Sequence, residues 1–111
     1  MLELEENLHY SLLLDMYSPL LTDKQSKVLK SFFNDNLGLS EIASLHDVSR
    51  QAVRDMIERG KVTLDDYELK LNLLSKMQNV KLDVEKTIDF IQKNAKKEEI
   101  LNKLHHILEQ I

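Results

Sequence analysis

The stretch "LSEIASLHDVSRQAVRDMIERGK", residues 39–61, decides the fold. Its apolar and small residues have the spacing of two short helices joined by a tight turn. The positions predicted to be buried are Ile42, Ala43, Leu45, Val48, Val53, Met56 and Ile57. Ala43 is the small residue that two closely crossing helices need, and "LHDV" is the turn. Ser40 and Ser49 are predicted to cap the two helices. The stretch therefore predicts a helix-turn-helix.

Asp47 occupies the turn position at which many helix-turn-helix motifs have glycine. The backbone there is left-handed, which suits glycine because it has no Cβ. Aspartate tolerates this conformation better than most residues, at some cost in free energy. We expect a positive φ angle at Asp47.

Two helices are predicted before this stretch. In the first, Leu4, Leu8, Leu12 and Met16 recur every four residues, with Leu13 and Tyr17 beside them. Pro19 ends that helix. Thr22 and Gln25 match a capping box that begins the second helix. Its predicted buried face consists of Val28, Leu29, Phe32 and Phe33, and the turn "NDNLG" at residues 34–38 ends it.

After the stretch, apolar residues three and four apart form a heptad seam at Ile57, Gly60, Leu64, Tyr67, Leu71 and Leu74. The seam predicts that the helix beginning after Ser49 continues, with a kink near Gly60, to about Met77. A break at Gly60–Thr63, with Thr63 capping a new helix, is the alternative.

Further along, residues 78–83 are predicted to be a loop. The next helix is marked by Val84, Ile88 and Ile91 and frays around "KNAKK" at residues 93–97. A last helix is marked by Leu101, Leu104, Leu108 and Ile111, with Ile100 and Ile107 flanking them.

We therefore predict a single all-α domain over residues 1–111. Residues 1–60 form the first helices and the helix-turn-helix core, and residues 61–111 form a helical tail that makes an orthogonal or bundle-like extension. The tail either folds back on the core or pairs with a second copy. We favour a homodimer, because long-tailed helical DNA-binding domains commonly dimerise, with Tyr67, Leu71 and Leu74 at the interface.

The composition excludes several classes of protein. The 111 residues contain no cysteine, so the chain has no disulfide framework and no thiolate metal site, which fits the cytoplasm. No apolar run approaches the roughly 20 residues that span a membrane, and the acidic N-terminus is unlike a signal peptide. The four histidines lack metal-ligand spacing. We expect no metal, cofactor, small-molecule substrate or catalytic residue.

Nucleic-acid contact is predicted at the start of the second helix of the motif. Arg50, Gln51 and Arg54 fit contacts to base edges. The other candidates are positions that could meet phosphates: Lys24, Lys27, Lys30, Arg59 and the helix starts at Ser40 and Ser49. Asp55 and Glu58 oppose such contact, and the net charge of −4 is not that of a strongly basic binder. An ordinary solvated helix face is the alternative interpretation.

Residues 21–60 resemble region four of sigma factors, in which a similar helix pair reads promoter DNA. The whole chain more closely resembles the YlxM family of small bacterial proteins. The markers are "LTDKQ", "SEIA", "VSRQAVRDMI" and "LDDYELKL". The resemblance implies an accessory or regulatory role in protein targeting by the signal recognition particle, through its RNA or its GTPase. The residues leave open DNA, RNA or a protein as the ligand, and an adaptor that contacts only the GTPase or its receptor is the alternative.

Overall fold

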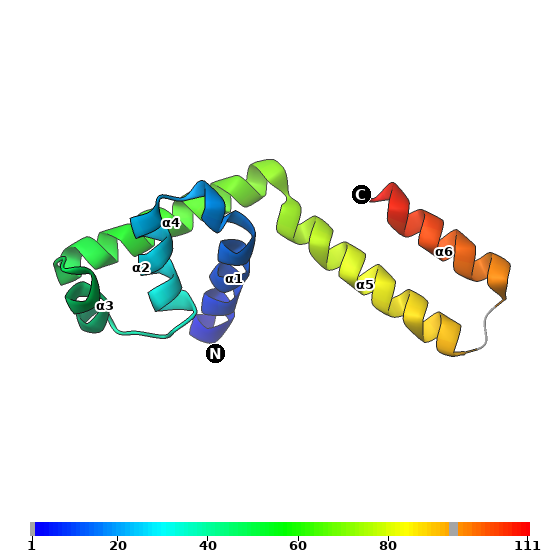
Figure 1. The fold of residues 1–111 in the computed structure, drawn as a ribbon, viewed down its shortest axis with the longest axis horizontal. Helices are drawn as coiled ribbons and strands as arrows, with labels where there is room; N and C mark the ends of the chain where they lie inside the picture. The colour runs from blue at the N-terminus through cyan, green and yellow to red at the C-terminus, as the bar shows by residue number, and fades with distance from the viewer. Residues whose placement is uncertain (1, 94–95) are drawn as a thin grey trace. The chain divides into compact units, whose positions relative to one another are not determined.

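The structure, a computed structural model, describes residues 2–93 and 96–111, and these contain helices but no strand. The elements in chain order are α1 (Leu2–Tyr17), the short 3-10 helix η1 (Ser18–Leu20), α2 (Asp23–Phe33), α3 (Leu39–His46), α4 (Arg50–Leu71), α5 (Leu73–Gln92) and α6 (Lys97–Glu109) (Figure 1). The predicted all-α fold is confirmed.

The chain divides into two compact units, one ending at Asn72 and the other formed by Leu73–Ile111. The division follows the end of α4, where Asn72 has a left-handed backbone with φ 55°. The sequence-based division between core and tail, at residue 60, falls inside α4. That the whole chain forms one domain stays a prediction.

The core of the N-terminal unit is built where α1, α2 and α3 pack against α4. Its fully buried side chains are Leu13, Leu14, Tyr17, Val28, Leu29, Ile42, Val53 and Leu64. The apolar face predicted for α1 is correct at Leu13 and Tyr17, which are fully buried, but wrong at Leu4 and Leu8, which are 70% and 61% exposed. A row spaced strictly by four residues drifts about 40° per step around the helix, so it leaves the packed face.

α2 begins as predicted. The Thr22 hydroxyl accepts a hydrogen bond from the Gln25 backbone N–H at 3.2 Å, and the Gln25 side chain accepts one from the Thr22 N–H. The helix buries Val28, Leu29 and Phe33, whereas Phe32 is only partly buried.

α4 runs without a break from Arg50 to Leu71, so the predicted continuation past Gly60 is confirmed and the alternative, a break at Gly60–Thr63, is wrong. Gly60 is buried within the helix, where its lack of a side chain makes room for Leu29 of α2. The helix also ends before the predicted Met77, because Asn72 takes the left-handed conformation that closes it.

α5 and α6 form the C-terminal unit. The predicted loop at residues 78–83 is wrong, since these residues continue α5. They contain neither glycine nor proline to end the helix. Residues 94–95 of "KNAKK" lie outside the described residues. In α6 the buried residue is Ile107, and the predicted stripe at Leu101, Leu104 and Leu108 stays exposed.

Candidate nucleic-acid interface

The turn between α3 and α4 has the geometry that the motif requires. Asp47 caps α3 with φ 54° and ψ 49°, which confirms its predicted left-handed backbone. The backbone N–H groups of both Asp47 and Val48 donate to the carbonyl of Ala43, the latter at 3.0 Å. Two backbone donors on one carbonyl fold the chain tightly around the end of α3.

One of the two predicted caps is correct. The Ser49 hydroxyl accepts a hydrogen bond from the Ala52 N–H at 3.0 Å and begins α4. The prediction for Ser40 is wrong, because Gly38 is the N-cap of α3 and Ser40 already lies in the first turn. Gly38 has the extended backbone of a cap (φ −74°, ψ 161°), so the helix begins earlier than the serine suggested.

The crossing of α3 and α4 confirms the helix-turn-helix. Ile42 and Ala43 of α3 and Val53 and Ile57 of α4 are all buried. Ala43 keeps the helices close, as the sequence predicted. Leu45 was predicted to be buried, but it is 64% exposed, because it lies on the outer side of the last turn of α3. The packing of α3 against α4 therefore fixes the position of the start of α4 and leaves its outer side exposed.

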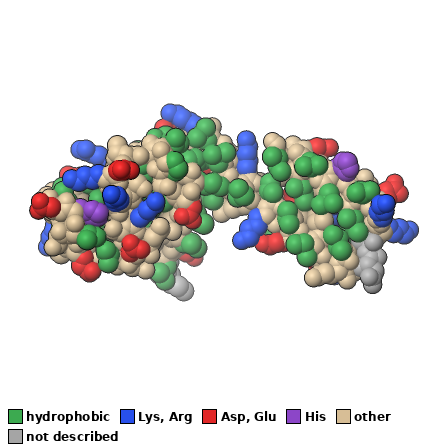
Figure 2. Space-filling view, viewed as in Figure 1, with side chains coloured by type: hydrophobic (Ala, Val, Ile, Leu, Met, Phe, Trp, Pro, Cys, Tyr) green, Lys and Arg blue, Asp and Glu red, His purple; other side chains and the backbone are tan. Residues whose placement is uncertain are grey.

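Arg50, Gln51 and Arg54 are all exposed on the first two turns of α4. The side-chain amide of Gln51 donates to the Asp55 carboxylate at 3.0 Å, one turn along the same ridge. This ridge therefore presents an amide already paired with a carboxylate, with arginines on its flank. Figure 2 shows acidic and basic side chains interspersed over the N-terminal unit.

Arg54 also borders a hollow of about 280 Å³ between α2, α3 and α4. Phe32, Leu39 and Ile57 supply apolar surface, and Glu58 and Lys61 also line the hollow. Sequence reasoning missed Lys61 as a neighbour of Arg54. The seven-residue spacing of the two, which places side chains on one helix face, was the available signal.

Lys61 is largely neutralised by acidic neighbours. Its Nζ lies 2.8 Å from Glu6 Oε1 and 3.7 Å from Glu58 Oε1. The hydrogen bond to Glu6 is the main reason that the pKa of Lys61 is raised. The chain as far as Asn72 carries 13 acidic residues against 8 basic ones. The net charge of the helix-turn-helix unit therefore opposes nonspecific attraction to phosphate.

Tyr10 joins α1 to the same part of α4. Its hydroxyl donates to Asp65 Oδ2 at 2.8 Å. Burial, together with the hydrogen bond and charge of Asp65, raises the pKa of Tyr10 to about 12. His9 Nε2 lies 3.8 Å from the same carboxylate. No sequence motif marked this cluster, because Asp65 lies 55 residues after Tyr10 in the chain.

The remaining predicted phosphate contacts are scattered. Lys24, Lys27 and Lys30 are exposed on α2, and Arg59 is exposed on α4. Gln25 and Arg59 line a common hollow, so Gln25 faces α4. Lys27, two residues further, points about 160° away from Gln25. Lys27 therefore does not share the side of α2 that faces α4, and its contact with phosphate stays a prediction.

The predicted dimer residues have different surroundings. The Tyr67 ring lies 5.8 Å from that of Tyr17, and its hydroxyl donates to the Leu20 carbonyl at 3.3 Å, both within the N-terminal unit. Leu71 is 44% exposed at the end of α4. Leu74 is buried, and it belongs to the C-terminal unit. Their role in an interface stays a prediction.

The described residues contain no group of three or more histidine or acidic residues that could hold a metal ion. No described helix is both long and apolar enough to cross a bilayer.

Residues 4–104 match the model of the UPF0122 family, described as "Putative helix-turn-helix protein, YlxM / p13 like". The chain belongs to this family. It is 41% identical to the UPF0122 protein of Clostridium kluyveri over 107 residues, covering 95% of this chain and 96% of the relative. It is 36% identical to that of Limosilactobacillus reuteri over 110 residues, covering 99% and 97%. The predicted YlxM resemblance is confirmed.

Proposed function

We propose that this UPF0122 protein is a non-enzymatic, nucleic-acid-binding regulatory or accessory protein of the signal recognition particle pathway, acting in the cytoplasm. The observation that carries the proposal is the start of α4, where Arg50, Gln51 and Arg54 are exposed beyond a rigid helix-turn-helix turn. This is the position from which such motifs reach base edges or phosphates.

The acidity of the unit limits what kind of binding is proposed. With few basic groups, affinity depends on a small number of well-placed contacts rather than on a broad electrostatic attraction. A folded RNA fits such a surface better than uniform duplex DNA, because its loops and bends offer shape as well as charge. The ligand we propose is therefore the RNA of the particle.

A mobility-shift experiment at two salt concentrations tests this. The wild-type chain is compared with Arg50→Ala/Arg54→Ala on the particle's RNA and on random duplex DNA. The matched control is Lys70→Ala/Lys76→Ala, which removes two exposed positive charges elsewhere. We expect only the arginine variant to lose RNA binding. The salt dependence of binding by the wild-type chain counts its phosphate contacts. Equal binding by all three proteins would contradict the proposal.

A protein-interaction adaptor is the second candidate function. It is favoured by the 13 acidic residues of the N-terminal unit and by the pairing of Gln51 with Asp55, both of which weaken a nucleic-acid surface. An adaptor would capture the targeting GTPase or its receptor from a nuclease-treated extract as efficiently as from an untreated one. Capture that disappears with nuclease would instead indicate that RNA bridges the two proteins.

A further inference from the structure

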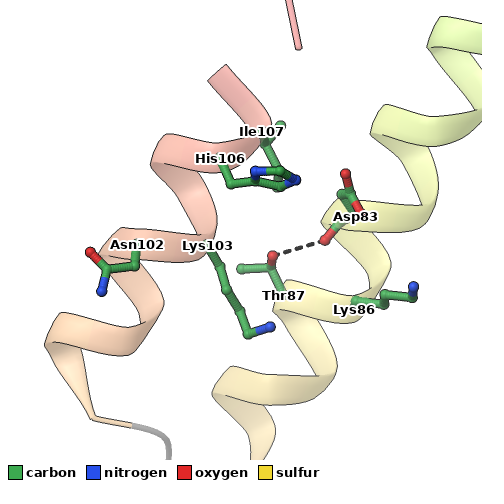
Figure 3. A pocket seen from close by; sticks show the side chains of 7 residues that line it. All are labelled: Asp83, Lys86, Thr87, Asn102, Lys103, His106 and Ile107. Atoms are coloured by element: carbon green, nitrogen blue, oxygen red, sulfur yellow. Dashed lines mark hydrogen bonds between the residues drawn. The ribbon is translucent and has the colours of Figure 1, made fainter. Parts of the chain in front are cut away.

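The C-terminal unit has a polar face and an apolar face. Where the two helices meet, the Thr87 hydroxyl donates to the Asp83 carbonyl at 2.8 Å, and the Gln110 amide donates to the Asp83 carboxylate. Lys103 lies over the Phe90 ring at 4.7 Å. A pocket of about 270 Å³ lies between the helices here, and Figure 3 shows His106 and Lys103 of α6 beside Thr87 of α5.

The C-terminal unit, a hairpin formed by α5 and α6, has a very small core of its own. Among its described residues only Leu74, Thr87 and Ile107 are buried. Folded units below about 40 residues usually depend on disulfides, metals or association with another surface. The chain has no cysteine, and its described residues hold no metal-binding group. Association with another surface is therefore the remaining way to stabilise this unit.

Both helices expose an apolar stripe with spacings of three and four residues, or multiples of these. The members, each 40–86% exposed, are Met77, Val84, Ile88 and Ile91 on α5, Leu101, Leu104 and Leu108 on α6, and Ile111 just after the end of α6. We name these eight residues the hairpin face. Figure 2 shows hydrophobic side chains gathered over this unit.

The two stripes lie on the same side of the hairpin. Ile88 follows Thr87, and Leu108 follows Ile107, so each stripe is turned about 100° from the side that faces the other helix. The contacts of Gln110 with Asp83 and of Lys103 with Phe90 show that the helices are antiparallel. In an antiparallel pair of helices, a rotation by the same angle about each helix axis, in the N- to C-terminal sense, brings both stripes to the same side of the pair.

We propose that two copies of this chain pair through the hairpin face and form a four-helix bundle. Eight side chains that are each about half exposed present on the order of 800 Å² of apolar surface, which is what each partner buries in a standard interface. An isolated monomer rarely leaves a patch of this size uncovered. A twofold pairing is also self-complementary, because each copy supplies the same antiparallel stripes.

The charges beside the face fit this pairing. On α5, Lys81 and Glu85 each follow a valine of the apolar side, and on α6, His105 and Glu109 each follow a leucine. The Gln110–Asp83 contact sets Glu109 level with the middle of α5. When α5 of one copy lies against α6 of the other, Lys81 meets Glu109, and Glu85 meets His105. The opposite charges of Lys81 and Glu109, repeated along both edges by the twofold symmetry, favour this register.

Light scattering and sedimentation of the full chain, from low to high micromolar concentration, test the proposal. We expect a dimer for the wild-type chain and a monomer for Ile88→Glu/Leu108→Glu, with self-association weakened at least about tenfold. The control is Val62→Glu/Leu69→Glu, which places two charges on exposed apolar positions of α4 and should leave the dimer intact. Circular dichroism checks that every variant keeps its helices.

Three results would overturn the proposal. A monomeric wild-type chain would mean that the N-terminal unit or another protein covers the face. A dimer that survives Ile88→Glu/Leu108→Glu would place the contact elsewhere. A dimer lost only in Leu71→Glu would assign it to the predicted seam at Tyr67, Leu71 and Leu74.

Charge reversal tests the register separately. Lys81→Glu should weaken the dimer, and Lys81→Glu combined with Glu109→Lys should restore it. Failure of the double variant to recover would contradict the pairing of α5 with α6. The mass measurement needs no nucleic acid, so its outcome is independent of the proposed function.

Discussion

Gly60 of α4 lies directly against Leu29 of α2. A Cβ at Gly60 would come within 2.6 Å of both terminal carbons of Leu29 and 3.1 Å of its Cγ. Leu29 is fully buried, so it has no free space into which to move. The absence of one side chain in the middle of a 22-residue helix therefore sets how closely α2 and α4 approach.

Gly60→Ala is expected to destabilise the protein although alanine is the better helix former. The gain in helix propensity is about 1 kcal/mol, and overpacking a core typically costs about 1–3 kcal/mol. We expect a net loss of about 1 kcal/mol in the free energy of unfolding, measured by urea denaturation.

Gly38→Ala is the matched control for that substitution. A Cβ at Gly38 meets only Glu41 Oε1, at 3.5 Å, and the backbone there has a negative φ. Its effect should come only from the poorer capping of α3 by alanine, with no overpacking. In a double-mutant cycle, Leu29→Ala should cost less in the Gly60→Ala protein than in the wild type, because it removes the clash. Simple additivity would show that the two residues do not interact as described.

Ser49→Ala is expected to lower the free energy of unfolding by about 1 kcal/mol, because the Ala52 N–H loses its hydrogen-bond acceptor. Ser40→Ala should have little effect or a slightly stabilising one, since Ser40 lies inside α3 and alanine favours helix. Thermal or urea unfolding of the two variants gives the comparison. Equal losses would contradict the assignment of Gly38 as the N-cap of α3.

Asp47→Gly is expected to stabilise the protein by up to about 1 kcal/mol, because glycine adopts φ 54° without steric cost. Asp47→Ala should instead destabilise it, since alanine lacks the polar side chain that eases this conformation. The pair distinguishes backbone strain from the removal of a negative charge, which both variants share. Destabilisation by glycine as well would show that the carboxylate itself supports the turn.

Stability is expected to fall as the pH rises from 10 towards 12. The pKa of Tyr10 is 10.0 in an unfolded chain and about 12 in the folded one. The folded protein therefore holds this proton more tightly, and the resulting stabilisation is complete below pH 10 and lost as the folded group titrates. The raised pKa of Lys61 acts in the same direction.

Tyr10→Phe isolates the tyrosine contribution to this pH dependence. Unfolding measured at several alkaline pH values should show a shallower decline for the variant than for the wild type. Tyrosinate absorbance should show one late-titrating tyrosine fewer. An unchanged decline would assign the pH dependence to Lys61 alone.

The sequence by itself determined the helix-turn-helix. Ala43, Asp47 and Ser49 act through local backbone chemistry, namely a close crossing, a left-handed turn and a cap, and such effects depend on a few neighbouring residues. The capping box at Thr22 and the stop at Pro19 are local in the same sense. Exposure of Arg50, Gln51 and Arg54 also followed from the helical period.

Only the tertiary structure decided which of several apolar faces is buried. On α1 the strict four-residue row was wrong because packing selects the face that meets α2 and α4, which includes Leu13 and Tyr17. At Gly60 the sequence suggested a kink. In the structure the glycine instead makes room for the side chain of Leu29, 31 positions earlier. Burial and close approach depend on residues distant in the chain, and periodicity within one helix carries no information about them.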